Sequence, residues 1–285
     1  MKRIVAYPFF VGNYSSIGMF IFYVMMVGLI MLENIWNFAN HKQVGSSSHN
    51  HDRKCDLANH SFSDMFQKES SDTREFYSPP LSDYGFQFAY SSISDQDIPQ
   101  LLKQFLQSTP QQALLLAHNH ITDQGFMELV AFLKENTTIK HLILSHNALS
   151  FNEFAKAGLA DLLKVNRFIG WLVFNHNDIS DLGAKHLGLA LAHNKSVKHL
   201  VLSHNYITDR GLTDLLAGLN HHPTLESLFL ANNQLSLEAL PLLMTFVAQQ
   251  SCLKRLDISG QFDPFDPLLI DLKKQCELKG IRLHY

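Results

Sequence analysis

The sequence has few cysteines, no excess of charge of one sign and none of the short motifs that bind metals or nucleotides. Its 285 residues include three cysteines, Cys55, Cys252 and Cys276, an odd number at unrelated spacings that argues against a disulfide framework. It contains no paired-cysteine zinc motif and no glycine-rich phosphate loop. The formal net charge is −3, so the chain lacks the basic footprint that nucleic-acid binding requires.

Catalytic residues do not stand out either. Ser, His and Asp are plentiful, but they recur at fixed positions of a repeat, whereas a catalytic group should interrupt a repeat. The sequence therefore predicts no enzyme, no cofactor and no small-molecule substrate. The alternative is a hydrolase with its site in residues 41–90, where no pair of nucleophile and base is recognisable.

The first 40 residues contain one long hydrophobic run. Lys2 and Arg3 precede 29 uncharged residues, and residues 14–32 within this run are just long enough to cross a bilayer. We therefore predict that residues 1–40 hold a membrane anchor and that the bulk of the chain lies across the membrane from Lys2. The alternatives are a cleaved signal peptide, which would make the protein secreted, and a hydrophobic helix docked on the protein itself.

Residues 41–82 differ in composition from the segments on either side. Their low apolar content and mixed charges predict a flexible linker. Four residues of metal-binding type lie within it, but their spacing fits no tight ligand pair, so a simple tether is favoured over a zinc site. These four residues are His49, His51, Cys55 and His60.

From residue 83 to residue 285 the sequence is built from repeats. Close copies of the stretch from His199 to Thr208 occur before and after it, and its Asn recurs at steps of 28, 30, 28 and 28 residues. A fixed period of this size indicates stacked copies of one supersecondary unit. Degenerate copies at both ends bring the predicted total to seven units. The recurring residues are Asn119, Asn147, Asn177, Asn205 and Asn233.

Each copy has the pattern of a strand, a turn and a helix. Leu or Phe, five and three residues before the Asn, alternate as in a half-buried strand. Thr or Ser three residues after the Asn is a predicted helix N-cap, and Ser150 with Glu153 has capping-box spacing. The following run has helical spacing, as in Leu212, Leu215, Leu216 and Leu219.

The recurring Asn belongs to the turn after the strand. Its side-chain amide can satisfy backbone donors and acceptors that are left bare where the chain leaves the strand. Stacked copies therefore predict a buried hydrogen-bonded series, here called the Asn ladder.

The units resemble leucine-rich repeats, and the period of 28 with a full helix resembles the ribonuclease-inhibitor-like subclass. Gly125, Gly183 and Gly211 match that pattern six residues after the Asn, while Glu153 and Ala239 depart from it. Over residues 85 to 260 the resemblance implies an α/β solenoid, or horseshoe, with a parallel β-sheet on the concave face and helices on the convex face.

The same resemblance bears on function, although the fold hosts many binding roles. It implies a non-catalytic module for protein–protein interaction, which the hydrophobic N-terminus would tether to a membrane. The array is also similar to the leucine-rich-repeat effectors that intracellular bacterial pathogens deliver into host cells. A secreted effector acting on host proteins is therefore the alternative.

The concave face is the expected contact surface for a partner protein. Alternation directs the middle residue of each strand to this face, giving a predicted solvent-exposed stripe, and such stripes usually mark contacts. Trp171 between His141 and His199 is the expected hot spot, because Trp offers a large area and an N–H group. The alternative is that β-propensity alone explains the stripe. The predicted binding residues are Trp171, Phe229, Val201, Val173, Ile143, His141, His199 and Asn175, and Leu115 completes the stripe.

A second series of residues directly precedes the recurring Asn. Stacked imidazoles at these positions could bind a metal, or could repel one another when protonated near pH ~6. Strand spacing places their nitrogens too far apart for a tetrahedral site, so we expect mild acid sensitivity and no metal. The residues of this series, here called the His column, are His118, His146, His176 and His204.

Overall fold

The computed structural model describes residues 85–108 and 111–285. In this part of the chain eight short strands alternate with seven α-helices, and one 3-10 helix precedes the first of them. The elements are β1 (Gly85–Gln87), η1 (Asp95–Asp97), α4 (Ile98–Gln107), β2 (Ala113–Leu115), α5 (Asp123–Glu135), β3 (His141–Ile143), α6 (Lys156–Val165), β4 (Trp171–Val173), α7 (Asp181–Leu191), β5 (His199–Val201), α8 (Asp209–Leu219), β6 (Ser227–Phe229), α9 (Ala239–Gln249), β7 (Arg255–Asp257), α10 (Pro267–Leu278) and β8 (Arg282–His284).

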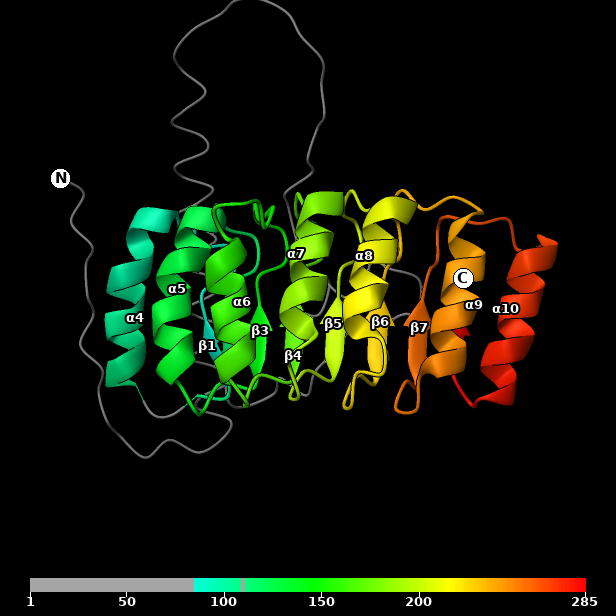
Figure 1. The fold of residues 1–285 in the computed structure, drawn as a ribbon. Coiled ribbons are helices and arrows are strands. Elements are labelled where there is room, and N and C mark those ends of the chain that lie inside the picture. Colours follow the sequence, from blue (N-terminus) through cyan, green and yellow to red (C-terminus); the bar gives the residue numbers. More distant parts are fainter. Residues whose placement is uncertain (1–84, 109–110) are drawn as a thin grey trace, which may run out of the picture. The chain divides into compact units, whose positions relative to one another are not determined.

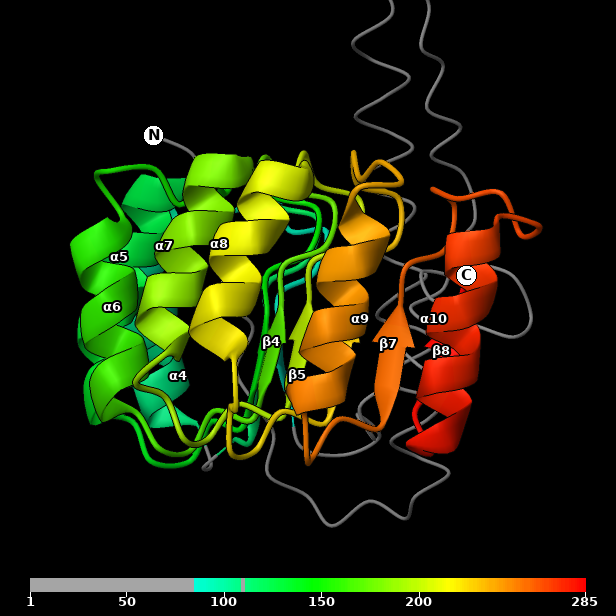
Figure 2. The same ribbon diagram turned by 45° about the vertical axis from the view of Figure 1, so that its right-hand side comes forward.

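The eight strands form one parallel sheet in sequence order, from β1 to β8. Each residue pairs with its equivalent one unit further along the chain, as Trp171 pairs with His199. The helices stand side by side in one layer (Figure 1), and the strands form a second layer behind them (Figure 2). The predicted α/β solenoid, with a parallel sheet on one face and helices on the other, is confirmed. We keep the term concave face for the sheet face that points away from the helices.

The core lies between the sheet and the helices. Leu200 and Leu202, on either side of Val201, are fully buried there, and Leu212 and Leu215 of α8 belong to the same cluster. The equivalent residues of the other units continue this cluster along the array. Each unit thus buries apolar area mainly against its neighbours, which is why one unit alone would not be stable.

Both ends of the array are closed by irregular units. At the first end, Pro99 lies in the first turn of α4, where its missing N–H costs no helical hydrogen bond. At the last end, the Asp266 side chain caps α10 by accepting a hydrogen bond from the Leu268 N–H at 2.8 Å. Gly280, with φ of 69°, ends that helix, and β8 then adds a closing strand beside β7.

The predicted capping box at α6 is wrong. The helix begins at Lys156, after an Ala155 N-cap that makes no side-chain capping bond. Phe151 is fully buried, with φ of 50°, at the place where most other units have an Asp. Its burial diverts the chain before the helix, and the Ser150 hydroxyl donates to Asp123 at 2.7 Å in place of capping α6.

Helices α7 and α8 approach each other until their backbones touch. A Cβ atom added at Gly218 of α8 would lie 1.9 Å from the carbonyl oxygen of Gly188 in α7. A Cβ atom added at Gly188 would lie 2.6 Å from the carbonyl oxygen of Asp214. These two positions therefore require glycine for steric reasons, not because of their backbone angles.

Three predictions fall on residues that the structure does not describe. They are the membrane anchor in residues 14–32, the linker of residues 41–82 and the group of His49, His51, Cys55 and His60. Among residues 85–108 and 111–285, none of the helices combines the length and the hydropathy needed to cross a membrane.

Candidate functional site

The amides of the Asn ladder link neighbouring units. Asn177 Nδ2 donates to the carbonyl oxygens of Leu144 in the preceding unit and Phe174 in its own unit, both at 3.0 Å. Its Oδ1 accepts from the Leu149 N–H, also at 3.0 Å. Asn119, Asn147, Asn205 and Asn233 make equivalent bonds. These amides satisfy backbone groups, which gives the turn edge of the sheet a structural role.

A second ladder is made by the Asp that follows the N-cap residue, and the sequence analysis missed it. Asp181 accepts from the Thr208 N–H at 2.7 Å and from its hydroxyl at 2.8 Å. The signal was available, because this Asp recurs at the repeat period with Phe151 and Leu237 as the exceptions. The members of this Asp ladder are Asp95, Asp123, Asp181 and Asp209, which accept from Thr122, Ser150, Thr208 and Ser236.

A third ladder, also missed, lies where the helices end. Asn166 Nδ2 donates to the Leu133 carbonyl oxygen of the preceding unit at 2.7 Å, and its Oδ1 accepts from the N–H groups of Phe168 and Ile169. Asn194 repeats this arrangement one unit later. His222 takes the next position, where it is buried and neither ring nitrogen has a hydrogen-bond partner.

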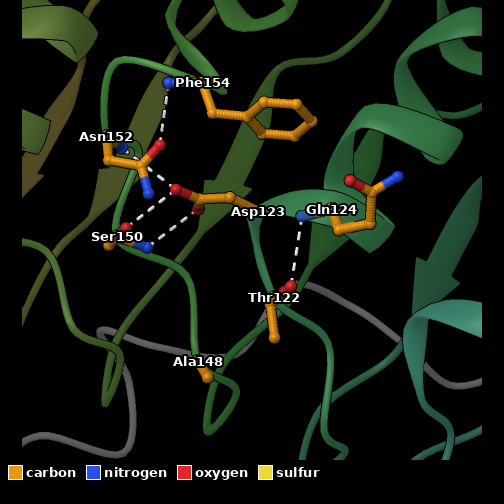
Figure 3. Close-up of a pocket in the computed structure, with 7 residues that line it drawn as sticks. All are labelled: Thr122, Asp123, Gln124, Ala148, Ser150, Asn152 and Phe154. Carbon is orange, nitrogen blue, oxygen red and sulfur yellow. Dashed lines mark hydrogen bonds between the residues drawn. The ribbon is translucent and has the colours of Figure 1, made fainter.

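A shallow pocket at the turn edge belongs to the Asp ladder (Figure 3). Asp123 lies at its centre and accepts from the backbone N–H groups of Ser150, Phe151 and Asn152 and from the Ser150 hydroxyl, all within 3.0 Å. The carboxylate therefore holds the next turn in place, and the Ser150 hydroxyl is used as its donor. We assign this pocket a structural role.

The His column forms a continuous stack of rings in the structure. Its three successive ring pairs have centroids 3.8 to 3.9 Å apart, and Tyr90 stacks on His118 at 4.1 Å. All four His have φ between 53° and 55°, in the left-handed region, which the sequence analysis did not foresee. Burial, with a smaller contribution from His176, lowers the pKa of His118 to about 4. Among the described residues, no group of three or more His, Cys, Asp or Glu is placed to hold a metal ion.

The apolar stripe of the concave face is buried, so the expectation of a solvent-exposed stripe is wrong. These residues are at most 3% exposed, although they lie outside the cluster between the sheet and the helices. Alternation fixes the face to which a side chain points but not its access to solvent, which depends on what packs beside and above it. The buried residues are Leu115, Ile143, Val173, Val201 and Phe229.

The ring trio of His141, Trp171 and His199 lies beside the buried apolar stripe, which we also call the apolar floor. The Trp171 ring centroid is 3.8 Å from that of His199 and 5.9 Å from that of His141. Trp171 and His141 are partly exposed, whereas His199 is 9% exposed and its Nδ1 lies 3.0 Å from the Ser227 hydroxyl. Burial lowers the pKa of His199 to about 4 and also lowers the pKa of His141, so both rings are neutral at pH 7.

Two buried polar atoms, on opposite sides of the apolar stripe, lack hydrogen-bond partners among the described residues. They are His141 Nδ1 and Oδ1 of Asn175, which lies on the opposite side of the apolar floor in the same unit as Trp171. Buried polar atoms are normally hydrogen-bonded, so unpaired ones call for an explanation. Because both atoms are shielded from solvent, a partner could supply the missing groups only after these side chains turn.

The comparisons with known proteins bear on the fold. A family model described as leucine rich repeat matches residues 135–150 and 193–216, which contain Asn147 and Asn205 of the Asn ladder. No curated protein matches the sequence. Among solved structures, the chain is similar to an internalin (inlF) from Listeria monocytogenes str. 4b F2365, at 22% identity and a TM-score of 0.40. That match covers 61% of this chain and 40% of the internalin chain, and a TM-score this low supports no functional inference.

Proposed function

We propose, on the premise that this chain is a leucine-rich repeat protein, that residues 85–285 form a non-catalytic module that binds another protein. The contact would lie on the concave face, where the ring trio stands beside the apolar floor. The three ladders support this choice, because the polar groups of the turns and helix ends already make hydrogen bonds within the array. These regions are therefore less suited to bind a partner than the concave face.

The single observation that carries the proposal is the position of Trp171. It is a large, partly exposed aromatic residue, packed between two neutral imidazoles on a rigid sheet. A preorganised aromatic side chain of this kind loses little conformational entropy on binding and is a common anchor of interfaces. Because the apolar stripe is buried, we assign Ile143, Val173, Val201 and Phe229 to the floor that shapes the site, and Trp171, His141 and Asn175 to direct contact.

The test compares two aromatic residues on the two edges of the sheet. Trp171→Ala removes the proposed anchor, whereas Tyr206→Ala removes an exposed aromatic side chain of the turn edge, which is 53% exposed. Affinity capture with the full-length chain should lose its partner with Trp171→Ala and keep it with Tyr206→Ala. Equal thermal unfolding curves for the two variants would show that the loss is not due to unfolding. If Trp171→Ala retains every captured protein, the proposal is wrong.

We further propose that residues 14–32 tether this module to a membrane. The support is the run of 29 uncharged residues after Lys2 and Arg3, long enough for one span. Carbonate extraction of membranes that contain the full-length protein should leave it in the pellet. Release into the supernatant would refute the spanning anchor, and a shortened N-terminus on the released protein would favour the secreted alternative.

A further inference from the structure

The residue just before each strand belongs to a hydrogen-bonded series at the N-terminal edge of the sheet. The Gly170 N–H donates to the Lys140 carbonyl oxygen at 2.9 Å, and the Lys198 N–H donates to that of Gly170 at 2.8 Å. The Glu226 N–H donates to Lys198 at 2.7 Å, and the Lys254 N–H donates to Glu226 at 2.8 Å. We call this series the entry column: Gln112, Lys140, Gly170, Lys198, Glu226 and Lys254.

In one stretch of the entry column a carboxylate, that of Glu226, forms ion pairs with lysines of both neighbouring units. Glu226 lies between two lysines, with Oε2 2.7 Å from Lys254 Nζ and Oε1 3.9 Å from Lys198 Nζ. The hydrogen bond from Lys254 lowers the pKa of Glu226, so this group is ionised at neutral pH. The pattern in this stretch is therefore lysine, carboxylate, lysine in successive units.

The neighbouring stretch is also flanked by two lysines, one of them Lys198 again, but it has no carboxylate. Gly170 lies between Lys140 and Lys198, as Glu226 lies between Lys198 and Lys254, and both flanking lysines are exposed. A Cβ atom added at Gly170 would come no closer than 3.7 Å to another heavy atom, the Ser196 carbonyl oxygen. This position therefore has room for a side-chain group and has an exposed lysine at the equivalent position of each neighbouring unit, and the next residue in the chain is Trp171.

We propose that this gap at Gly170 receives an Asp or Glu side chain of the partner protein, while an adjacent apolar residue of the partner packs on Trp171. This inference rests on the proposed function and names the chemistry of the partner. The Lys198 ammonium group lies at the limit of pairing distance from Glu226, so it can also contact a second carboxylate. Such a pair would add modest affinity but would fix the register of the partner along the sheet.

The geometry favours an acidic protein segment over a polyanion. Binding of a phosphate backbone requires a continuous series of cations. In the entry column the series is interrupted, because Glu226 follows Lys198. The gap at Gly170 leaves space for one carboxylate between two lysines of the entry column, which matches a single acidic side chain. A short acidic peptide therefore serves as the probe, with nucleic acid and lipid as the competing outcomes.

The experiment places the missing carboxylate in the chain itself. Gly170 does not have a positive φ, so both Gly170→Glu and Gly170→Gln can adopt its backbone conformation. The two variants add side chains of the same size and differ in charge. Each is made in the full-length chain and titrated with a fluorescein-labelled peptide that carries Glu beside Phe, and with the same peptide in which Gln replaces Glu.

We expect the wild-type chain to bind the Glu peptide more tightly than the Gln peptide. Gly170→Glu should weaken binding of the Glu peptide by about tenfold, and Gly170→Gln by no more than about twofold, because two ion pairs are lost in the first case only. Equal weakening by both substitutions would mean that size alone matters and would overturn the inference. Equal binding of both peptides to the wild-type chain would also overturn it.

Two further measurements separate this inference from the proposed function. A captured partner that requires Trp171 but binds Gly170→Glu as well as the wild type would refute the acidic contact and leave the proposed function intact. Double-stranded DNA and vesicles with phosphatidylserine are tested against the same variants. If the DNA or the vesicles bind more tightly than the Glu peptide, and if Gly170→Glu weakens that binding as well, the gap would be a polyanion site. This result would refute the proposed contact with an acidic protein segment.

Discussion

The ladders at the turn edge of the sheet and the entry column at the opposite edge follow opposite rules. At the turn edge, after the strands, the same residue types recur from unit to unit, namely Asn, His and Asp, and their groups link adjacent units. At the entry edge, before the strands, the residue type changes from Lys to Gly to Glu, and one strand begins with Trp171. Repetition thus identifies the positions that hold the solenoid together, whereas the proposed contact residues lie where the residue type varies from unit to unit.

The difference between the two edges predicts that substitutions at the turn edge cause the largest loss of stability. Asn177→Leu removes an amide that makes hydrogen bonds to two units, and it leaves several buried backbone groups without partners. Each orphaned group costs about 1–3 kcal/mol, so we expect a loss of about 4 kcal/mol in the free energy of unfolding. Urea denaturation measures this loss. The exposed Asn220, changed to Leu, is the control and should be nearly neutral.

The contact between helices α7 and α8 gives the next largest effect. Gly218→Ala places a methyl group on the Gly188 carbonyl and forces the helices apart, so we expect a loss of about 3 kcal/mol. Gly170→Ala at the entry edge adds the same methyl group in open space and should change stability by less than about 0.5 kcal/mol. Equal melting temperatures for the two variants would disagree with the backbone contact in the structure.

Acid should weaken the fold through the buried imidazoles. Burial lowers the pKa of His118 and His199 to about 4 in the folded chain, against 6.5 as the ordinary value. Between these two values the unfolded chain binds more protons, so stability is complete above pH ~6.5 and falls as the pH falls towards ~4. Allowing for partial solvent screening, we expect a loss of about 2 kcal/mol between pH ~7 and ~5.

The control for this pH dependence is the double variant His118→Asn and His199→Gln. Asn tolerates the left-handed backbone conformation of residue 118, and neither new side chain titrates. Melting temperatures of this variant should vary less with pH over the same range than those of the wild type. A wild-type melting temperature that is constant from pH ~7.5 to ~5 would argue against buried neutral imidazoles.

The smallest effect is expected at the entry edge. Glu226→Gln breaks the pairing with Lys198 and Lys254, and exposed ion pairs contribute little, so a change of less than about 1 kcal/mol is expected. Denaturation at low and high salt measures it, because screening should remove the difference. A loss as large as that of Asn177→Leu would make the entry edge part of the scaffold and would remove the distinction between the two edges.

The sequence predicted the fold because its main signal is periodic. Asn119 to Asn233 recur at almost constant steps, so the order of the strands and the face of the helices follow from one unit. The Asp ladder was equally periodic, yet Phe151 interrupts it, and Asp after an N-cap residue is common enough to conceal a contact between units. Burial of the apolar stripe could not be predicted, because alternation carries no information on what covers a sheet.

The candidate site was predictable only in part. Trp171 attracts notice by its type, and pairing in register places His141 and His199 beside it. The gap at Gly170 is recognisable only by comparison with Glu226, which the structure places between Lys198 and Lys254. The sequence does not give the distances between side chains, and these distances decide which residues form ion pairs. The left-handed conformation of the His column was also out of reach, since His adopts it only where the turn requires it.

The most direct test of the distinction between the edges is site-specific photocrosslinking. A benzophenone amino acid replaces either Trp171 at the entry edge or Tyr206 at the turn edge of the full-length chain, and crosslinked proteins are identified by mass spectrometry. We predict that position 171 captures a partner protein through a peptide that contains Asp or Glu, and that position 206 captures none. Crosslinks to the same partner from position 206, with none from position 171, would contradict the account.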